Sequence, residues 1–290
     1  MNDYVLMTDA NADLWPEIIE ELGIEVIPMP ITLDGKDYLC YPDQREMPFH
    51  ECYEIIRSGK PVSTAQVTSI AFLGYFEPFL QKGLDVLYIA FSSGLSGTYN
   101  SALMAARELK EKYPNNKVAV WDSRSASLGQ GLLVYHAAQE KNAGKSLDEV
   151  IANLKLNTPH LCHWFTVADL NYLRRGGRVT GASAFVGTML NIKPVLHIDE
   201  DGHLIPMVKA RGRKNSLKEL LNHMVETCEN PEEQMIFIGH GDSLEDAETL
   251  ANMIREKFTV KDICINYIGP VVGCHSSPGT IALFFLDSKR

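Results

Sequence analysis

The sequence has little that points to nucleic acid, export or a membrane span. Its 27 lysines and arginines are outnumbered by 37 aspartates and glutamates, which gives a formal net charge of -10. Such an excess of negative charge repels nucleic acid and anionic membranes. The first twelve residues lack a basic segment, and the apolar run at residues 281–286 is far too short to cross a bilayer. We therefore expect a cytoplasmic protein with no nucleic-acid partner.

The six cysteines are scattered and never form the C-x-x-C spacing of a metal or redox site. We therefore expect reduced thiols and no bound metal, with Cys274, beside His275, as a structural residue. The phosphate-binding patterns G-x-G-x-x-G and G-x-x-x-x-G-K-[ST] are absent as well, so nothing supports a nucleotide or another cofactor.

Short apolar runs alternate with amphipathic stretches through the first 159 residues. Residues 85–91 are apolar enough for a buried strand, and residues 99–113 carry apolar side chains three or four apart, as on one helix face. The alternation predicts a mostly parallel sheet with helices on both faces. Asp13 is expected to cap a helix over residues 14–22.

After Pro159 the pattern changes. Asp-Glu-Asp-Gly at residues 199–202 predicts a hairpin, and helices and strands follow to residue 268. We therefore expect two α/β domains, the second with a mixed sheet. The N-terminal domain is placed at residues 1–159 and the second at 160–280, with the tail 281–290 free to return a strand to the first domain.

Hydroxyl groups gather in three loops. Ser92-Ser93-Gly-Leu-Ser96-Gly-Thr98 joins a predicted strand to a helix, where free backbone N–H groups and the helix dipole favour an anion. The simpler interpretation is that Ser96 or Thr98 caps the helix. Thr64 lies in a second polar loop at residues 61–66, and His275 lies in a third at residues 273–279. Together these loops are candidates for an anion-binding pocket.

Basic residues are concentrated near two predicted turns of this acidic chain. They are Arg174, Arg175 and Arg178 at the first turn and Lys209, Arg211, Arg213 and Lys214 at the second. The cluster is either a solvated face or a docking surface for an acidic or phosphorylated partner.

Short polar and glycine-containing motifs are distributed along the whole chain. They are Thr8-Asp9, Asp13-Leu14, Val62-Ser-Thr-Ala-Gln66, Ser92-Ser-Gly-Leu-Ser-Gly-Thr98 with Tyr99, Asp122-Ser123, Leu173-Arg-Arg-Gly-Gly-Arg178, Lys193-Pro194, Arg211-Gly-Arg-Lys214 and Gly269-Pro-Val-Val-Gly-Cys-His275 with Pro278-Gly279. In their order these motifs resemble those of the DegV family, the fatty-acid-binding subunits of bacterial fatty acid kinase. Two positions depart from the family pattern: Val67 follows Gln66 where proline is usual, and Ser277 replaces a glycine before Pro278.

The resemblance implies a non-catalytic protein that holds a long-chain fatty acid between or within its two domains. Thr64 and a serine of the loop, Ser96 in preference to Ser93, would hold the carboxylate with Gly97 and His275. The resemblance also implies that Arg175, Arg178 and Arg211 face a kinase subunit, which phosphorylates the acid to an acyl phosphate and supplies ATP and metal. The bound acid is the expected ligand, and its handover involves transient contact with a membrane.

Two other classes of function remain open from the sequence. A serine esterase would use Ser96 with His275, and a lipid transfer protein would carry the acid without a kinase. Chain length, unsaturation and oligomeric state are not encoded in any pattern of the sequence.

Overall fold

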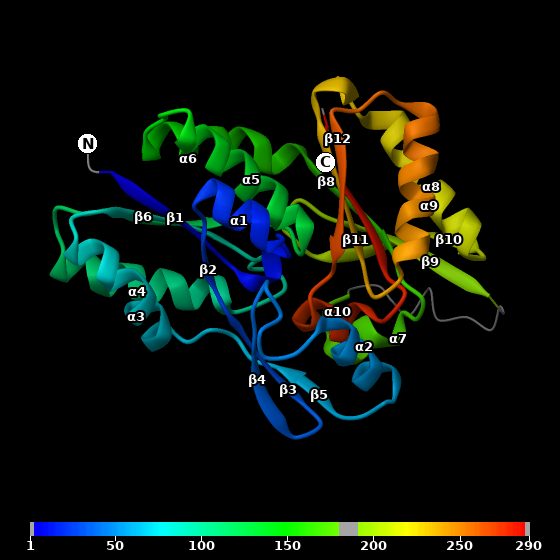
Figure 1. The fold of residues 1–290 in the computed structure, drawn as a ribbon, viewed down its shortest axis with the longest axis horizontal. Coiled ribbons are helices and arrows are strands. Elements are labelled where there is room, and N and C mark those ends of the chain that lie inside the picture. The colour runs from blue at the N-terminus through cyan, green and yellow to red at the C-terminus, as the bar shows by residue number, and fades with distance from the viewer. Residues whose placement is uncertain (1–2, 180–190, 288–290) are drawn as a thin grey trace.

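The computed structural model describes residues 3–179 and 191–287, which form three sheets surrounded by helices (Figure 1). The first is a parallel four-stranded sheet whose strand order is β2-β1-β6-β7. Its strands are β1 (Tyr4–Asp9), β2 (Glu25–Ile27), β6 (Asp85–Ala90) and β7 (Val118–Asp122).

Helices cover both faces of this parallel sheet. One face packs against α3 (Ser69–Gln81) and α4 (Thr98–Lys112), and the other lies under α5 (Leu128–Asn142). Side chains alternate across β6 because successive residues of a strand point to opposite faces: Tyr88 contacts the α3 side, while Leu87 and Ile89 contact the α5 side. The predicted arrangement of a parallel sheet with helices on both faces is confirmed.

The largest sheet has six strands in the order β10-β9-β8-β13-β11-β12. Of its strand pairs only β11 and β12 run parallel, so the sheet is mixed, as predicted. Its strands are β8 (Leu161–Thr166), β9 (Ile192–Ile198), β10 (Leu204–Arg211), β11 (Met235–His240), β12 (Asp262–Tyr267) and β13 (Ile281–Leu286). Its outer face packs against α8 (Arg213–Thr227) and α9 (Leu244–Lys257).

The C-terminal strand β13 lies between β8 and β11 in the six-stranded sheet, antiparallel to both. The expectation that the tail returns to the first domain is therefore wrong for residues 281–286; residues 288–290 lie outside the described part of the chain. An uninterrupted apolar segment suits this central position, since both faces of the strand are buried.

Between the two larger sheets lies α5. It contacts β1 and β6 of the parallel sheet and β8, β11 and β13 of the mixed sheet, and one apolar cluster runs through all of them. Helix α5 belongs to residues 1–159, but it also packs against strands from the second half of the chain. The division into domains at residues 1–159 and 160–280 therefore stays a proposal.

A small antiparallel sheet, β4-β3-β5, lies beside the other two (Figure 1). It consists of β3 (Met29–Leu33), β4 (Lys36–Cys40) and β5 (Val62–Thr64), and α2 (Phe49–Arg57) connects the last two. Residues 61–66, predicted as a loop, thus contain a three-residue strand that pairs with β3.

Other helices position loops around the sheets. They include the 3-10 helix η1 (Ala10–Ala12), α1 (Pro16–Leu22), α6 (Leu147–Asn157), α7 (Asn171–Gly176) and α10 (Pro270–Ser276). Asp13 does not cap α1, whose N-cap is Trp15; it ends η1 in the left-handed conformation. Within residues 3–179 and 191–287, no helix has the length and apolar character needed to cross a membrane.

Candidate functional site

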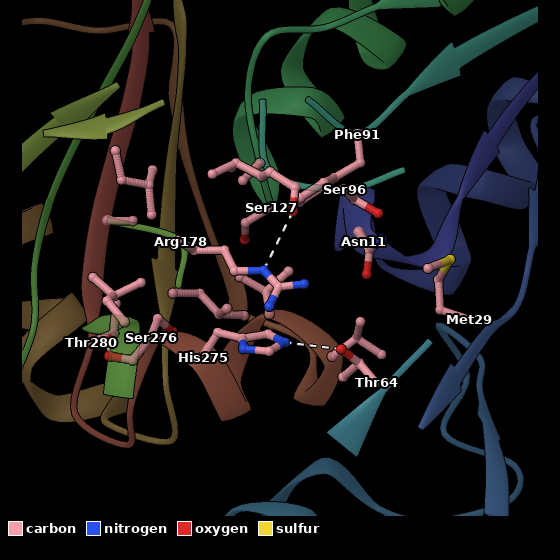
Figure 2. Close-up of a pocket in the computed structure, with 18 of the residues that line it drawn as sticks. Asn11, Met29, Thr64, Phe91, Ser96, Ser127, Arg178, His275, Ser276 and Thr280 are labelled. Carbon is pink, nitrogen blue, oxygen red and sulfur yellow. Dashed lines mark hydrogen bonds between the residues drawn. The ribbon is translucent and has the colours of Figure 1, made fainter. Parts of the chain in front are cut away.

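A cavity of about 280 Å³ lies where the carboxyl ends of the parallel strands approach α10 and the mixed sheet (Figure 2). This edge is where parallel sheets usually bind ligands. Segments far apart in the sequence build the wall, and most of its surface comes from apolar side chains. The apolar lining includes Met29, Phe91, Leu95, Phe165, Leu173, Leu204, Ile268, Val271 and Val272.

The hydroxyl of Thr64 and the imidazole of His275 meet at one side of this cavity. Thr64 Oγ1 lies 2.9 Å from His275 Nε2, the contact drawn in Figure 2. Pairing of Ile31 with Thr64 fixes the end of β5, and α10 carries the histidine. Burial, and to a lesser extent the nearby charge of Arg178, lowers the pKa of His275 to about 4. The imidazole is therefore neutral at pH 7.

Ser96 lies in the same cavity wall, in the loop before α4. Its Oγ is 3.0 Å from Thr98 Oγ1 and accepts a hydrogen bond from the Thr98 backbone N–H at 3.2 Å. The hydroxyl thus binds the first residue of α4. The N-cap residue is Gly97 and the cap has no side-chain hydrogen bond, so the interpretation that Ser96 or Thr98 caps the helix is wrong. A side chain at position 97 would collide with Gln66, because an added Cβ would lie 2.0 Å from Gln66 Oε1.

The structure brings four of the five predicted carboxylate-binding residues to the cavity and leaves out one. Thr64, Ser96, Gly97 and His275 line it. Ser93 is exposed, and its backbone N–H donates to Asp122 Oδ1 at the end of β7. Of the two serines considered for the carboxylate, Ser96 lines the cavity and Ser93 does not.

The three predicted docking arginines lie in different surroundings. Arg175 is exposed, with its guanidinium 4.6 Å from the centre of the Tyr172 ring, and Arg211 is exposed at the end of β10. Arg178 extends over the cavity (Figure 2), where its Nε donates to the Leu95 carbonyl at 3.4 Å. Arg178 is therefore part of the cavity wall as well as of the basic cluster.

Sequence reasoning missed four polar residues of the wall: Asn11, Ser127, His163 and Thr280. Ser127 Oγ donates a short hydrogen bond to Asp13 Oδ2 inside the protein. Burial raises the pKa of Asp13 well above its usual value, and the hydrogen bond from Ser127 only partly offsets this. Ser127 begins α5 with a φ of 54°, a strained conformation that no sequence pattern signals.

The esterase alternative needs a hydrogen bond between a nucleophile and a base. Ser96 Oγ contacts Thr98, and His275 Nε2 contacts Thr64; no hydrogen bond joins Ser96 to His275. The predicted nucleophile and base therefore do not form a catalytic pair in this structure.

Within the described residues, one group of side chains has metal-ligand atoms within 4.8 Å of one another: His50, Glu54 and Asp242. Arg57 Nη1 already bonds both carboxylates, at 2.7 Å to Glu54 and 2.5 Å to Asp242. Because this cation neutralises the acidic pair, we assign no metal to the group.

Comparison with known proteins gives consistent matches. A family model described as an uncharacterised protein of the DegV family matches residues 4–288. A DegV domain-containing protein of Clostridium perfringens is 47% identical over 290 residues, 100% of this chain and 99% of that protein. A solved DegV family protein from Thermus thermophilus, described by its fatty acid binding, has a TM-score of 0.89 and 30% identity, covering 98% of this chain and 99% of that one. A solved DegV lipid-binding protein from Thermotoga maritima has a TM-score of 0.87 and 29% identity, covering 99% of both chains.

Proposed function

The chain belongs to the DegV family, and on that basis we propose that it binds one long-chain fatty acid and presents the carboxylate to a fatty acid kinase. The observation that carries the proposal is the cavity: its wall is mostly apolar, and Thr64, Ser96 and His275 are among the residues that add polar groups to it. Such a pocket suits a ligand with a long apolar body and one polar end.

The carboxylate accepts hydrogen bonds from the hydroxyls of Thr64 and Ser96. When the neutral imidazole of His275 carries its proton on Nε2, it donates to Thr64 Oγ1 at 2.9 Å and leaves the threonine proton free for the ligand. A hydrogen bond to a charged group contributes about 1.5–3 kcal/mol. Two such donors, aligned by a histidine, distinguish an acid from an alcohol of equal length.

Burial of the chain supplies most of the affinity. An acyl tail of ~14 methylenes contributes a gross ~11 kcal/mol at ~0.8 kcal/mol each. Ordering costs reduce this figure, but sub-micromolar binding remains within reach. Release into water is correspondingly slow, which favours direct handover to a partner or a membrane.

The kinase subunit supplies ATP and metal in this scheme, and this protein supplies the positioned acid. Arg175 and Arg211 are exposed and suit an acidic docking surface on the partner. The protein itself then needs no catalytic residue. Its place of action is the cytoplasm, where ATP is available.

Native mass spectrometry of protein purified from a bacterial host tests ligand binding. We expect about one equivalent of co-purified fatty acid, identified by extraction and gas chromatography. Recovery of none from several preparations would refute the proposal. Turnover of a chromogenic ester would favour the esterase instead.

Incubation with a kinase subunit and ATP tests the second half of the proposal. Acyl phosphate should form, and Arg175→Ala and Arg211→Ala should reduce its rate without loss of bound acid. Arg255→Ala serves as control, because Arg255 lies on α9, whose apolar face packs on the mixed sheet, and bonds Asn252. Tight fatty acid binding without any acyl phosphate would indicate a lipid carrier that needs no kinase.

A further inference from the structure

Two side-chain atoms in the wall of the fatty acid cavity are buried and lack a hydrogen-bond partner in the part of the chain that the structure describes. They are Oδ1 of Asn11 and Oγ of Ser276. By contrast, the hydroxyl of Thr64 and the imidazole of His275 contact each other. A polar atom left unpaired in the interior costs free energy, and native proteins contain few of them. Both atoms are therefore candidates for contact with a ligand.

A buried network holds the backbone around Asn11 in place. Asn11 lies in η1 directly after β1, and its backbone N–H donates to Asp9 Oδ1 at 3.0 Å. The other carboxyl oxygen of Asp9 accepts hydrogen bonds from the Tyr88 hydroxyl at 2.6 Å and from Gln130 Nε2 at 3.2 Å. Asn11 itself is only 3% exposed. Its side-chain amide therefore stays in the cavity wall and does not reach bulk solvent.

The chemistry of the amide oxygen limits which group can pair with it. Oδ1 of Asn11 accepts hydrogen bonds and does not donate them. The ionised carboxylate of a fatty acid also only accepts, and its methylene chain offers no donor. An unsubstituted fatty acid therefore excludes water from Asn11 without supplying a hydrogen bond in return. The partner that fits this atom is a hydroxyl group carried by the acyl chain.

We propose that the cavity accepts a hydroxylated fatty acid, in which a hydroxyl on the acyl chain donates a hydrogen bond to Oδ1 of Asn11. The proposal rests on the proposed function, because it needs a carboxylate held at Thr64 and Ser96. It adds a second polar contact and, with it, an oxygenated class of ligand. The hydrogen bond offsets the cost of burying the ligand hydroxyl and also removes the cost of the unpaired amide oxygen.

Ser276 provides a comparison within the same wall. Figure 2 shows Asn11 and Ser276 on opposite sides of Arg178 and His275, so the two unpaired atoms are separate contacts. The Ser276 hydroxyl donates as well as accepts, so an acceptor such as a carboxylate is enough to satisfy it. Asn11 Oδ1 is the atom whose partner must be a donor, and it is therefore the one that distinguishes a hydroxylated chain from a plain one.

Titration with stearic acid and with hydroxystearic acids tests the proposal. The probes carry the hydroxyl near the carboxyl end, in the middle of the chain or toward the methyl end. At least one isomer should bind the wild type as tightly as stearate or more tightly. Asn11→Leu, which replaces the amide by an apolar group of the same branched shape, should weaken binding of that isomer about tenfold and change stearate binding less than twofold. Asn11→Ala should also lower its affinity relative to stearate.

Ser276→Ala is the matched control, because it removes the other unpaired atom of the wall. It should leave the ratio of hydroxystearate to stearate affinity unchanged. A second measurement needs no variant: the oxostearate of the same position, which only accepts, should bind the wild type more weakly than the hydroxystearate. An unchanged affinity ratio in the Asn11 variants, or wild-type binding of every hydroxystearate far below that of stearate, would overturn the proposal and leave the proposed function standing. If the wild type binds neither class of acid, the proposed function itself fails.

Discussion

At the scale of single residues, the site depends on side chains from distant parts of the sequence. Thr64 and His275 are 211 positions apart, yet their hydrogen bond joins the small sheet to α10. The histidine in this hydrogen bond is neutral at pH 7, because burial is the main cause that lowers the pKa of His275 to about 4. A charged imidazole would bind a carboxylate more strongly, but a neutral one keeps the polarity of the cavity wall constant across physiological pH.

The first prediction concerns the two hydroxyls. Thr64→Val and Ser96→Ala should each weaken fatty acid binding by about 1.5–3 kcal/mol, the value of a hydrogen bond to a charged group. The double variant should lose less than the sum, since both donors bind one carboxylate. The measurement is a titration of acid and of the matching alcohol.

Ser93→Ala is the control for this pair, because Ser93 lies in the same loop but is exposed and outside the cavity. Its affinity for the acid should equal that of the wild type. An unchanged preference for acid over alcohol in both the Thr64 and Ser96 variants would rule out these loops as the carboxylate site.

A second prediction at this scale follows from Asp13. Burial raises its pKa in the folded protein well above the unfolded value, so the folded state favours the protonated carboxyl. Its contribution to stability is therefore greatest at acid pH and is lost as the pH rises toward the raised pKa. Asp13→Asn should gain stability relative to the wild type as pH increases from about 4.

Urea unfolding of the two proteins from pH 4 to pH 8 measures this effect. Asp201→Asn, at an exposed turn, is the control for replacing an aspartate by asparagine outside the interior. A constant difference between Asp13→Asn and the wild type over the whole range would show that Asp13 keeps an ordinary pKa in the fold.

At the scale of elements, α2 links the small sheet to α10. Tyr53 of α2 is fully buried, and its hydroxyl donates to the Ile268 carbonyl at 2.6 Å. Gly273 leaves the room for this ring, because an added Cβ would lie 2.2 Å from the Tyr53 hydroxyl oxygen. Since α2 leads into the segment that carries Thr64, its packing on α10 sets the distance to His275.

The third prediction follows from that close approach. Gly273→Ala should lower both stability and fatty acid affinity, because α2 must move away from α10. The matched control is Gly74→Ala in the middle of α3, where an added Cβ meets nothing within 4 Å. That change should be neutral or stabilising, by up to about 1 kcal/mol.

Thermal unfolding and ligand titration of the two variants give the comparison. If Gly273→Ala bound fatty acid as the wild type does while losing stability, α2 would stabilise the fold without positioning the site. Equal stability and equal fatty acid affinity of the two alanine variants would refute the close approach of Gly273 to the Tyr53 ring.

Elements with clear periodicity could be predicted from the sequence, and short polar elements could not. Helix α4 has apolar side chains at helical spacing, and it was located nearly to its observed ends. By contrast α10 has seven residues and β5 has three, both in polar or glycine-rich segments. Pro270 directly after Gly269 was a usable signal for the start of α10.

The site was predictable in part for the same reason. Hydroxyl-rich loops and the family resemblance identified Thr64, Ser96 and His275. Arg178 was expected only on the docking surface, and it lines the cavity. In an irregular segment no periodicity tells which way a side chain points. The directions of the Ser93 and Arg178 side chains therefore follow only from the three-dimensional structure.

At the scale of the whole molecule, one apolar cluster joins the parallel and the mixed sheets. From Leu128 to Ala138 every residue of α5 except His136 is buried, so this part of the helix has no solvent-facing stripe like that of a surface helix. Removing either sheet would expose apolar surface on this helix. The two halves of the chain thus depend on each other for stability.

We accordingly predict a single cooperative unfolding transition. Calorimetry should give equal calorimetric and van't Hoff enthalpies, as expected for a two-state protein. A fragment of residues 1–159 should bind a hydrophobic dye and aggregate, because α5 lacks its cover. Two resolved transitions, or a soluble and compact fragment, would instead support independent domains.

The burial of α5 also determines how its backbone exchanges hydrogen with solvent. Amides at the edge of a sheet, such as those of the short strand β5, are released by local opening, which costs little free energy. No comparable local motion frees a helix enclosed by two sheets. Deuterium should therefore reach the central amides of α5 only when the entire molecule unfolds, so their exchange rate records global stability, with or without a bound acid.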